Sequence, residues 1–172
     1  WAVGKNDSGQ LGDGTTTQRM NPVQMLDAGG SPISGVTSVL AGHVHSVFLK
    51  NDGTVWATGV NAKGQLGDGT NSDRLNPVRV LSSLGGALSE VVKVSADGSS
   101  VFLKSDGTVW ATGTNGSGEL GDGTTINRSN PIQVIDAGGS PLIGVVDVSA
   151  GSFHMVYLKN DGTVWATGKN DY

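Results

Sequence analysis

A repeat marked by tryptophan runs through the whole chain. The spacings between successive tryptophans are 55, 54 and 55 residues, counted over Trp1, Trp56, Trp110 and Trp165. Repeats of about fifty residues are typical of arrays in which each unit buries its apolar faces against neighbouring units. A side chain present in every copy is therefore explained first by folding and stacking. We predict a single array of repeats 1–55, 56–109 and 110–164, followed by a partial copy at 165–172.

Every copy contains four short runs that alternate in polarity like β-strands. The first run holds the tryptophan, the second follows an Asn-Pro pair, and two more complete the copy. An Asp-Gly pair joins the fourth run to the next first run, which is typical of a tight antiparallel hairpin. For the copy that contains Trp56, the predicted strands are 54–59, 77–81, 91–96 and 100–104.

These strands predict an all-β propeller with four-stranded antiparallel blades. The chain has 28 glycines, which indicates many tight turns, and no long helix is expected. A solenoid is the competing architecture, but the coils of a parallel β-helix are shorter and rarely contain a hairpin. Three long connections are expected to cross from one sheet to the next, at 27–35, 82–90 and 136–144.

Composition excludes several classes of function. The 11 basic residues are scattered, so we expect no nucleic-acid partner. The absence of cysteine excludes disulfides and thiol chemistry. No apolar run approaches the ~18 residues that cross a bilayer, so no membrane insertion is expected. The first residue is Trp1 and not methionine, and we therefore expect a piece of a longer protein.

The copies share a long motif that resembles a known family. The motif begins W-x-x-G-x-N-x-x-G-Q-L-G-D-G-T, continues with an arginine and Asn-Pro, and ends V-x-A-G-x-x-H-S-x-x-L-x-x-D-G. It is similar to the repeat of the regulator of chromosome condensation, RCC1, in its bacterial type. The resemblance implies a propeller that usually has seven blades, of which this chain would hold about three. The expected division is two strands of one blade, two complete blades and three strands of another.

One repeat position carries histidine in two copies. His45 and His154 share this position, whereas the copy between them is one residue shorter and has Ser99 there. An acid–base or metal site would need partners at unlike positions, so we interpret both histidines as structural side chains that bond a backbone group of the neighbouring blade. At Ser99 this contact must be replaced or lost.

The recurring aspartates and arginines receive a structural interpretation as well. A calcium loop needs several oxygen ligands that close on a glutamate, and here a single aspartate repeats, so these aspartates are expected to bond the amides of their own turns. The arginines are expected to hold the loop through carbonyls or an aspartate, with contact to a partner as the alternative. These residues are Asp13, Asp68, Asp122, Arg19, Arg74 and Arg128.

The four tryptophans are expected to pack in the core between blades, because a recurring strand position more often serves packing than a row of ligand-stacking rings. No serine lies in a nucleophile elbow, and no glycine-rich loop precedes a Lys-Thr pair. We therefore predict no catalytic residue, no cofactor and no metal site, and we do not expect an enzyme.

Recognition is expected where the copies differ, because loops on a rigid scaffold commonly carry it. The long connections differ, and so does one short loop in each copy. The candidate partner-binding residues in that loop are Thr16, Thr17, Gln18, Asn71, Ser72, Asp73, Thr125, Ile126 and Asn127.

Three classes of function remain open at this point. The leading hypothesis is a noncatalytic scaffold that binds a protein partner. The resemblance also permits guanine-nucleotide exchange on a small GTPase. The third class is a secreted or cell-surface inhibitor or receptor-like module, which the composition rich in Gly, Thr, Asn and Ser slightly favours. Open blade edges also predict self-association of this chain.

Overall fold

The computed structural model describes residues 1–171, and within them every regular element is a β-strand. No helix in this part of the chain is long and apolar enough to span a membrane. The strands are β1 Ala2–Gly4, β2 Arg19–Val23, β3 Val36–Ala41, β4 His45–Lys50, β5 Val55–Gly59, β6 Arg74–Arg79, β7 Val91–Ala96, β8 Ser99–Lys104, β9 Val109–Gly113, β10 Arg128–Gln133, β11 Val145–Ala150, β12 His154–Lys159 and β13 Val164–Gly168.

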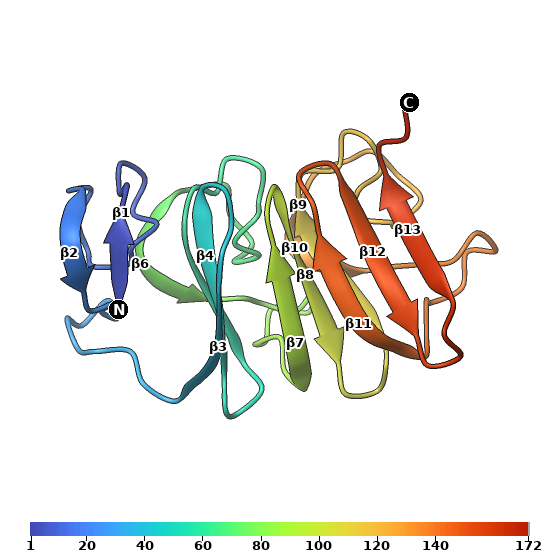
Figure 1. Cartoon of the computed structure of the whole chain (residues 1–172), viewed down its shortest axis with the longest axis horizontal. Helices are drawn as coiled ribbons and strands as arrows, with labels where there is room; N and C mark the ends of the chain where they lie inside the picture. The colour runs from blue at the N-terminus through green and yellow to red at the C-terminus, as the bar shows by residue number, and fades with distance from the viewer. Residues whose placement is uncertain (172) are drawn as a thin grey trace.

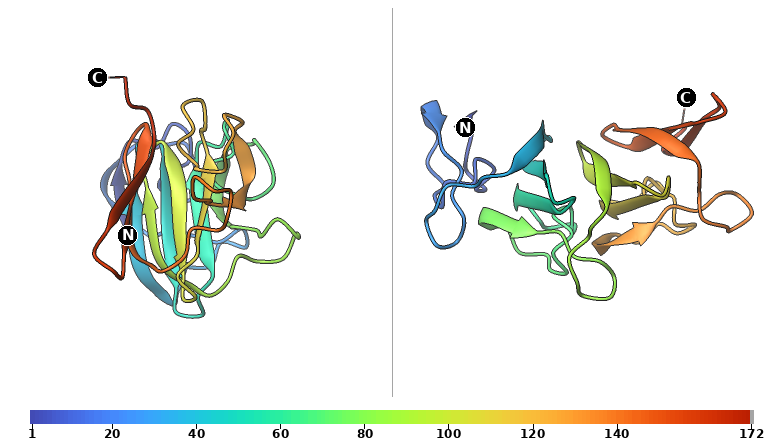
Figure 2. Two further views of the ribbon diagram at one scale, coloured as in Figure 1. Left: turned by 90° about the vertical axis from the view of Figure 1, so that its right-hand side faces the viewer. Right: turned by 90° about the horizontal axis from the view of Figure 1, so that it is seen from below.

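The strands form four separate antiparallel sheets in chain order (Figure 1). A two-stranded sheet, β1–β2, is followed by the four-stranded sheets β3–β6 and β7–β10 and by the three-stranded sheet β11–β13. The all-β prediction and the predicted division into two, four, four and three strands are both confirmed. Seen from below, the sheets follow one another along an arc, as the blades of an incomplete propeller do (Figure 2).

The hairpins within the sheets form where the sequence has Asp-Gly. In the turn between β4 and β5, Gly53 adopts a φ of 74°, a left-handed conformation that favours glycine. The carboxylate of Asp52 accepts hydrogen bonds from the amide of Thr54 at 3.0 Å and from its hydroxyl at 2.6 Å. The turn fixes the register, so that Phe48 lies opposite Trp56.

The strand after the variable loop starts earlier than predicted. We expected it to begin at Pro77, but β6 begins at Arg74, which lies opposite Gly59 across an irregularity in the register. Proline is accommodated inside this strand because β6 is the edge of its sheet, where one missing N–H breaks no inner ladder. Strands β4, β8 and β12 also begin one residue earlier than expected.

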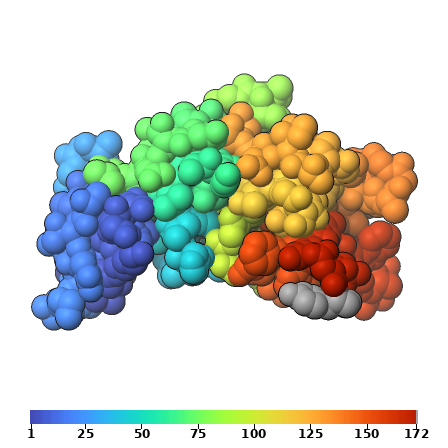
Figure 3. Space-filling view, turned by 90° about the horizontal axis from the view of Figure 1, so that it is seen from above, coloured from blue at the N-terminus to red at the C-terminus, as the bar shows by residue number. Residues whose placement is uncertain are grey.

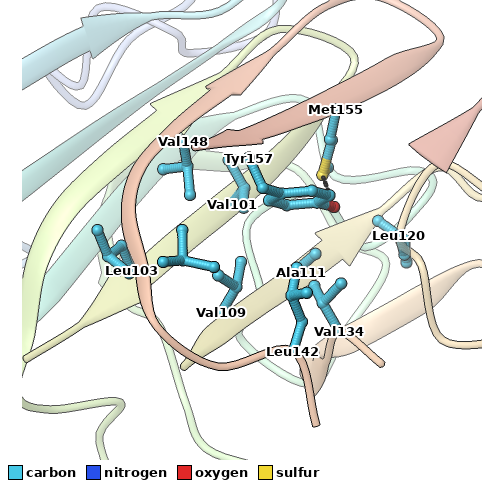
Figure 4. Close-up of a cluster of buried hydrophobic side chains, with 11 residues drawn as sticks. Val101, Leu103, Val109, Ala111, Leu120, Val134, Leu142, Val148, Met155 and Tyr157 are labelled. Carbon is cyan, nitrogen blue, oxygen red and sulfur yellow. Dashed lines mark hydrogen bonds between the residues drawn. The ribbon is translucent and has the colours of Figure 1, made fainter. Parts of the chain in front are cut away.

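Two hydrophobic clusters hold neighbouring sheets together. The first lies between sheets β3–β6 and β7–β10 and takes in Phe102 from the second of them. The next lies between β7–β10 and β11–β13 and surrounds Tyr157 with valine and leucine side chains (Figure 4). In each case an aromatic side chain of one sheet enters the apolar face of the preceding sheet. The blades therefore depend on one another for burial, as stacked repeats do.

The alternating strand directions sort the loops onto two faces. One face, here called the loop face, carries the loops 5–18, 60–73 and 114–127 and the short turns that precede β4, β8 and β12. The opposite face, here called the hairpin face, carries the Asp-Gly turns, whereas the long connections project outward from the side of the molecule between the two faces (Figure 2). Figure 3 looks onto the loop face. The variable loops thus lie on the loop face, whereas the variable connections lie at the side of the molecule (Figure 2).

Candidate interaction surface

A buried asparagine organises each loop of the loop face. Asn61 has no exposed surface, and its amide donates to the Asp68 carboxylate at 2.9 Å and to the Thr70 carbonyl at 3.0 Å. Its side-chain oxygen accepts from the backbone N–H of Leu66 at 3.0 Å. Asn6 and Asn115 make the same set of bonds in their own copies. We did not assign a role to this residue from the sequence, although it recurs in every copy seven positions before the aspartate.

The recurring aspartate and arginine pair with each other inside the same loop. Asp68 accepts from the amide and hydroxyl of Thr70 through one oxygen, and from Arg74 Nε at 2.7 Å through the other. Burial pushes the pKa of Asp68 up, but the bonds from Thr70 and Arg74 outweigh it, and the pKa lies below its usual value. The carboxylate is thus ionised and surrounded by donors of its own loop, which leaves it little capacity for an outside ligand.

Each loop also locks onto the next sheet. The hydroxyl of Thr112 donates to the Gly64 carbonyl at 2.9 Å, and the hydroxyl of Ser100 donates to the Gln65 carbonyl at 2.8 Å. The side chain of Leu66 is fully buried beneath these bonds. Thr58 and Ser46 hold the preceding loop in the same way. The loop is therefore a rigid part of the interface between blades, although it has no regular secondary structure.

Two equivalent glycines provide a matched test of this interlocking. Gly64 and Gly118 both have left-handed backbones, with φ of 82° and 76°. A Cβ on Gly64 would lie 2.5 Å from Ser129 Cα, whereas a Cβ on Gly118 would meet nothing nearer than 3.9 Å. Gly64→Ala is therefore expected to lower the unfolding free energy by about 2 kcal/mol more than Gly118→Ala. Urea denaturation of dilute protein measures both, and equal losses would contradict a packed loop at Gly64.

The two recurring histidines are in different environments, and within residues 1–171 neither makes the predicted bond to a backbone group. His45 is buried, and its Nε2 lies 2.9 Å from the hydroxyl oxygen of Ser100 in the next sheet. Because that hydroxyl donates to Gln65, the imidazole is the donor in this contact. His154 is exposed, because no further sheet follows β11–β13 within the described residues. The sequence showed the shared position but not the side chain opposite it.

The copy that lacks the histidine has changed on both sides of the contact. Ser99 bonds the carbonyl of Thr114 in its own sheet at 2.9 Å. In the next sheet Met155 takes the place that Ser100 has opposite His45, so the hydroxyl partner is absent too. Tyr157 is buried there, with its hydroxyl 3.1 Å from that of Thr167 and 3.5 Å from the Met155 sulfur. Burial raises the pKa of Tyr157 to about 12.

The tryptophans are less buried than predicted. Trp110 packs against the first core cluster, but Trp1 is 83% exposed and Trp165 is 40% exposed. The exposed pair lies in the two incomplete sheets, where the described chain offers no neighbour on one side. Trp56 is half-buried, and the cations of Lys50 and Arg79 lie 5.3 and 5.2 Å from its ring centre. Its role is to anchor long side chains beside the hairpin as well as to fill the interface.

The nine candidate residues of the variable loops project from the loop face, but not all are free. Asp73 and Asn127 accept hydrogen bonds from the backbone N–H groups of Asn61 and Asn115, at 2.7 and 2.9 Å. The equivalent Gln18 has a longer side chain, makes no such bond within residues 1–171, and instead donates to the Met20 sulfur at 3.9 Å. The remaining six side chains make no hydrogen bond inside the loops and are exposed, namely Thr16, Thr17, Asn71, Ser72, Thr125 and Ile126. These six form the candidate interaction surface.

The fold and the interlocked loops define a segment of a β-propeller built from tandem repeats. Two descriptions of the Regulator of chromosome condensation (RCC1) repeat match the chain, one over residues 1–49, 52–103 and 106–158 and the other over 36–65 and 145–172. The chain therefore belongs to the RCC1 repeat family.

Relatives agree with this assignment, and solved structures share the fold. The chain is 30% identical over its whole length to the human E3 ubiquitin-protein ligase HERC2, of which it covers 3%, and 30% identical over 131 residues to human HERC4, of which it covers 12%. Human WBSCR16 superposes with a TM-score of 0.76 at 23% identity, over 96% of this chain and 41% of that one. Prp20p of Saccharomyces cerevisiae gives 0.73, also at 23% identity and over 98% and 41%.

These matches also bear on two sequence predictions. The chain spans a small part of the ligases and about two-fifths of the solved propellers, in agreement with about three blades of a larger ring. The ligases named here are from human, and they give no support to the predicted bacterial type.

Proposed function

We propose that the chain is part of a noncatalytic propeller that binds a protein partner through the loop face. The observation that carries the proposal is the separation between recurring and variable side chains. The recurring Asn, Asp and Arg side chains are occupied by bonds within the loops, as at Asn61, Asp68 and Arg74. The six variable side chains stand exposed on the same rigid loops. Pre-ordered loops lose little entropy on binding, which favours recognition.

The proposal assigns recognition to the repeats and leaves any activity to other parts of a longer polypeptide. HERC2 and HERC4 carry names of ubiquitin ligases, but this chain covers only 3% and 12% of them. Guanine-nucleotide exchange is the alternative that the family resemblance suggested, and a secreted binding module is the third. Prp20p has been characterised for binding to Gsp1p and histones, and that property belongs to Prp20p.

Two charge-insertion variants distinguish the loop face from the long connections. The loop-face variant carries Thr17→Arg, Ser72→Arg and Ile126→Arg, three exposed and equivalent positions. The control variant carries Ala28→Arg, Ser83→Arg and Ala137→Arg, exposed and equivalent positions in the long connections. Partners crosslinked to the unmodified chain are quantified by mass spectrometry. We expect the loop-face variant to lose capture of the specific partner by about tenfold or more, and the control to retain it.

The reverse outcome would contradict the proposal. Loss of capture by the connection variant alone would move recognition to the long connections. Nucleotide release from small GTPases is measured in the same preparations, and a catalysed release by the unmodified chain would replace the scaffold with the exchange-factor alternative.

A further inference from the structure

Two of the buried asparagines that organise the loops lie in sequences that N-linked glycosylation recognises. The acceptor in that modification is an asparagine two positions before a serine or threonine, with any residue except proline between them. This triplet occurs at Asn6-Asp7-Ser8, Asn115-Gly116-Ser117 and Asn127-Arg128-Ser129. Acceptor triplets usually lie on the surface of secreted proteins. Here Asn127 is exposed, whereas Asn6 and Asn115 are completely buried.

The amide nitrogen of Asn115 has no room for a sugar. Glycosylation attaches the sugar to this Nδ2 atom and replaces one of its two hydrogens. In the folded chain Nδ2 donates to Asp122 Oδ1 at 3.0 Å and to the carbonyls of Thr124 and Ile126, both at 3.1 Å. A glycan at Asn115 would therefore break bonds that hold the loop, and its bulk would not fit inside the packed loop.

Asn6 is held in the same way in the first loop. Its Nδ2 donates to Asp13 Oδ1 and to the Thr15 carbonyl, both at 3.0 Å, and to the Thr17 carbonyl at 3.2 Å. The residue has no exposed surface. Two acceptor triplets thus begin with an asparagine whose amide the fold needs unmodified.

The third triplet is different, because its asparagine can carry a sugar in the folded chain. Asn127 is exposed, and its side-chain oxygen accepts from the backbone N–H of Asn115 at 2.9 Å. Within residues 1–171 its Nδ2 makes no hydrogen bond, so a sugar on that nitrogen would displace no contact. Asn127 therefore serves as an internal reference for the two buried acceptors.

The middle copy shows that the fold does not need the serine of the triplet. Asn61 makes the same buried bonds, but Lys63 stands two positions after it in place of serine. Lys63 and Ser117 are both exposed. Each donates its backbone N–H to a side chain two positions later, namely Gln65 at 2.9 Å and Glu119 at 2.7 Å. Replacing the serine by lysine should therefore remove the acceptor triplet and leave the asparagine bonds intact.

We propose that N-linked glycosylation at Asn6 or Asn115 is incompatible with this fold, and that the chain therefore folds in a compartment where this modification does not take place. Both amides are accessible before folding, so a glycosylating compartment would modify them and prevent the loops from closing. The inference goes beyond the interaction function proposed above. It leaves the candidate interaction surface unchanged and opposes the secreted alternative in a glycosylating host.

Expression in a glycosylating host, once in the cytosol and once behind a secretion signal, tests the proposal. We expect the secreted chain to be modified at Asn115 and to give about tenfold less folded protein than the cytosolic chain. The double variant Ser8→Lys and Ser117→Lys should restore the secreted yield. Asn127→Asp is the matched control and should not restore it, since Asp73 has this role in the middle copy.

Two further measurements make the outcome decisive. Urea denaturation of the cytosolic variants should give unfolding free energies within about 0.5 kcal/mol of the unmodified chain. Mass spectrometry after enzymatic release of the glycans identifies each occupied asparagine. Folded secreted protein with a glycan at Asn6 or Asn115 would overturn the proposal, and so would folded secreted protein with both sites empty. Equal secreted yields of the unmodified chain and the double variant would overturn it as well.

Discussion

Replacing Asn61 by alanine is expected to lower the free energy of unfolding by about 3 kcal/mol, although the residue lies in a loop. The substitution removes the acceptor for the Leu66 amide and the donor to Asp68 and Thr70, all at a site with no solvent access. Leaving buried polar groups without partners costs about 1–3 kcal/mol for each group, and several are affected here. Equilibrium urea denaturation at neutral pH measures the change.

An exposed asparagine in the same loop is the matched control. Asn71→Ala should change the unfolding free energy by less than about 0.5 kcal/mol, because its side chain makes no hydrogen bond in the loop and is exposed. Equal losses for Asn61→Ala and Asn71→Ala would show that the buried asparagine does not organise the loop.

Lowering the pH from 7 to 4 is expected to destabilise the chain by about 3 kcal/mol through His45. Burial lowers the pKa of this imidazole from 6.5 to about 4 in the folded state, with a smaller opposing effect of Asp97. The unfolded chain therefore binds a proton near pH 6.5 that the folded chain takes up only near pH 4. The contribution is fully present above pH 6.5 and is lost as the pH falls towards 4.

The His45→Ser variant isolates this effect. Serine occupies the equivalent position in the next copy, at Ser99, so the fold accommodates it. The variant should lose most of the slope of unfolding free energy between pH 6.5 and 4, as measured by denaturation at several pH values. The recurring aspartates do not interfere, because their pKa values are lowered from 3.8 and their contribution is lost below this window. An unchanged slope would show that His45 is not the titrating group.

The fold could be predicted closely from the sequence because its signals are local. Asp-Gly turns and alternating runs located the strands, and the spacing of the copies located the cuts between sheets. The start of β6 was missed because an Asn-Pro pair is usually outside a strand, and only the edge position of β6 explains how Pro77 is accommodated.

The candidate surface was less predictable because its chemistry depends on contacts between copies. His45 hydrogen-bonds the hydroxyl of Ser100 because neighbouring sheets stack on each other. The sequence of a single copy does not reveal this stacking. The exposure of Trp1 and Trp165 follows from the incomplete sheets. Asp73 and Asn127 were predicted as binding residues because they differ between copies. Both instead stabilise their own loop, because an aspartate or an asparagine oxygen can accept a hydrogen bond from the equivalent backbone N–H group, that of Asn61 or Asn115.

Hydrogen exchange of backbone amides tests the central claim most directly, namely that recurring side chains hold the loops rigid while variable ones remain available. The amides of Leu66 and Leu120, which donate to the buried asparagines, should exchange as slowly as those of the inner strands. The amides of Asn71 and Thr125, a few residues away, should exchange rapidly. Fast exchange at Leu66 and Leu120, or equal exchange at all four amides, would contradict this account.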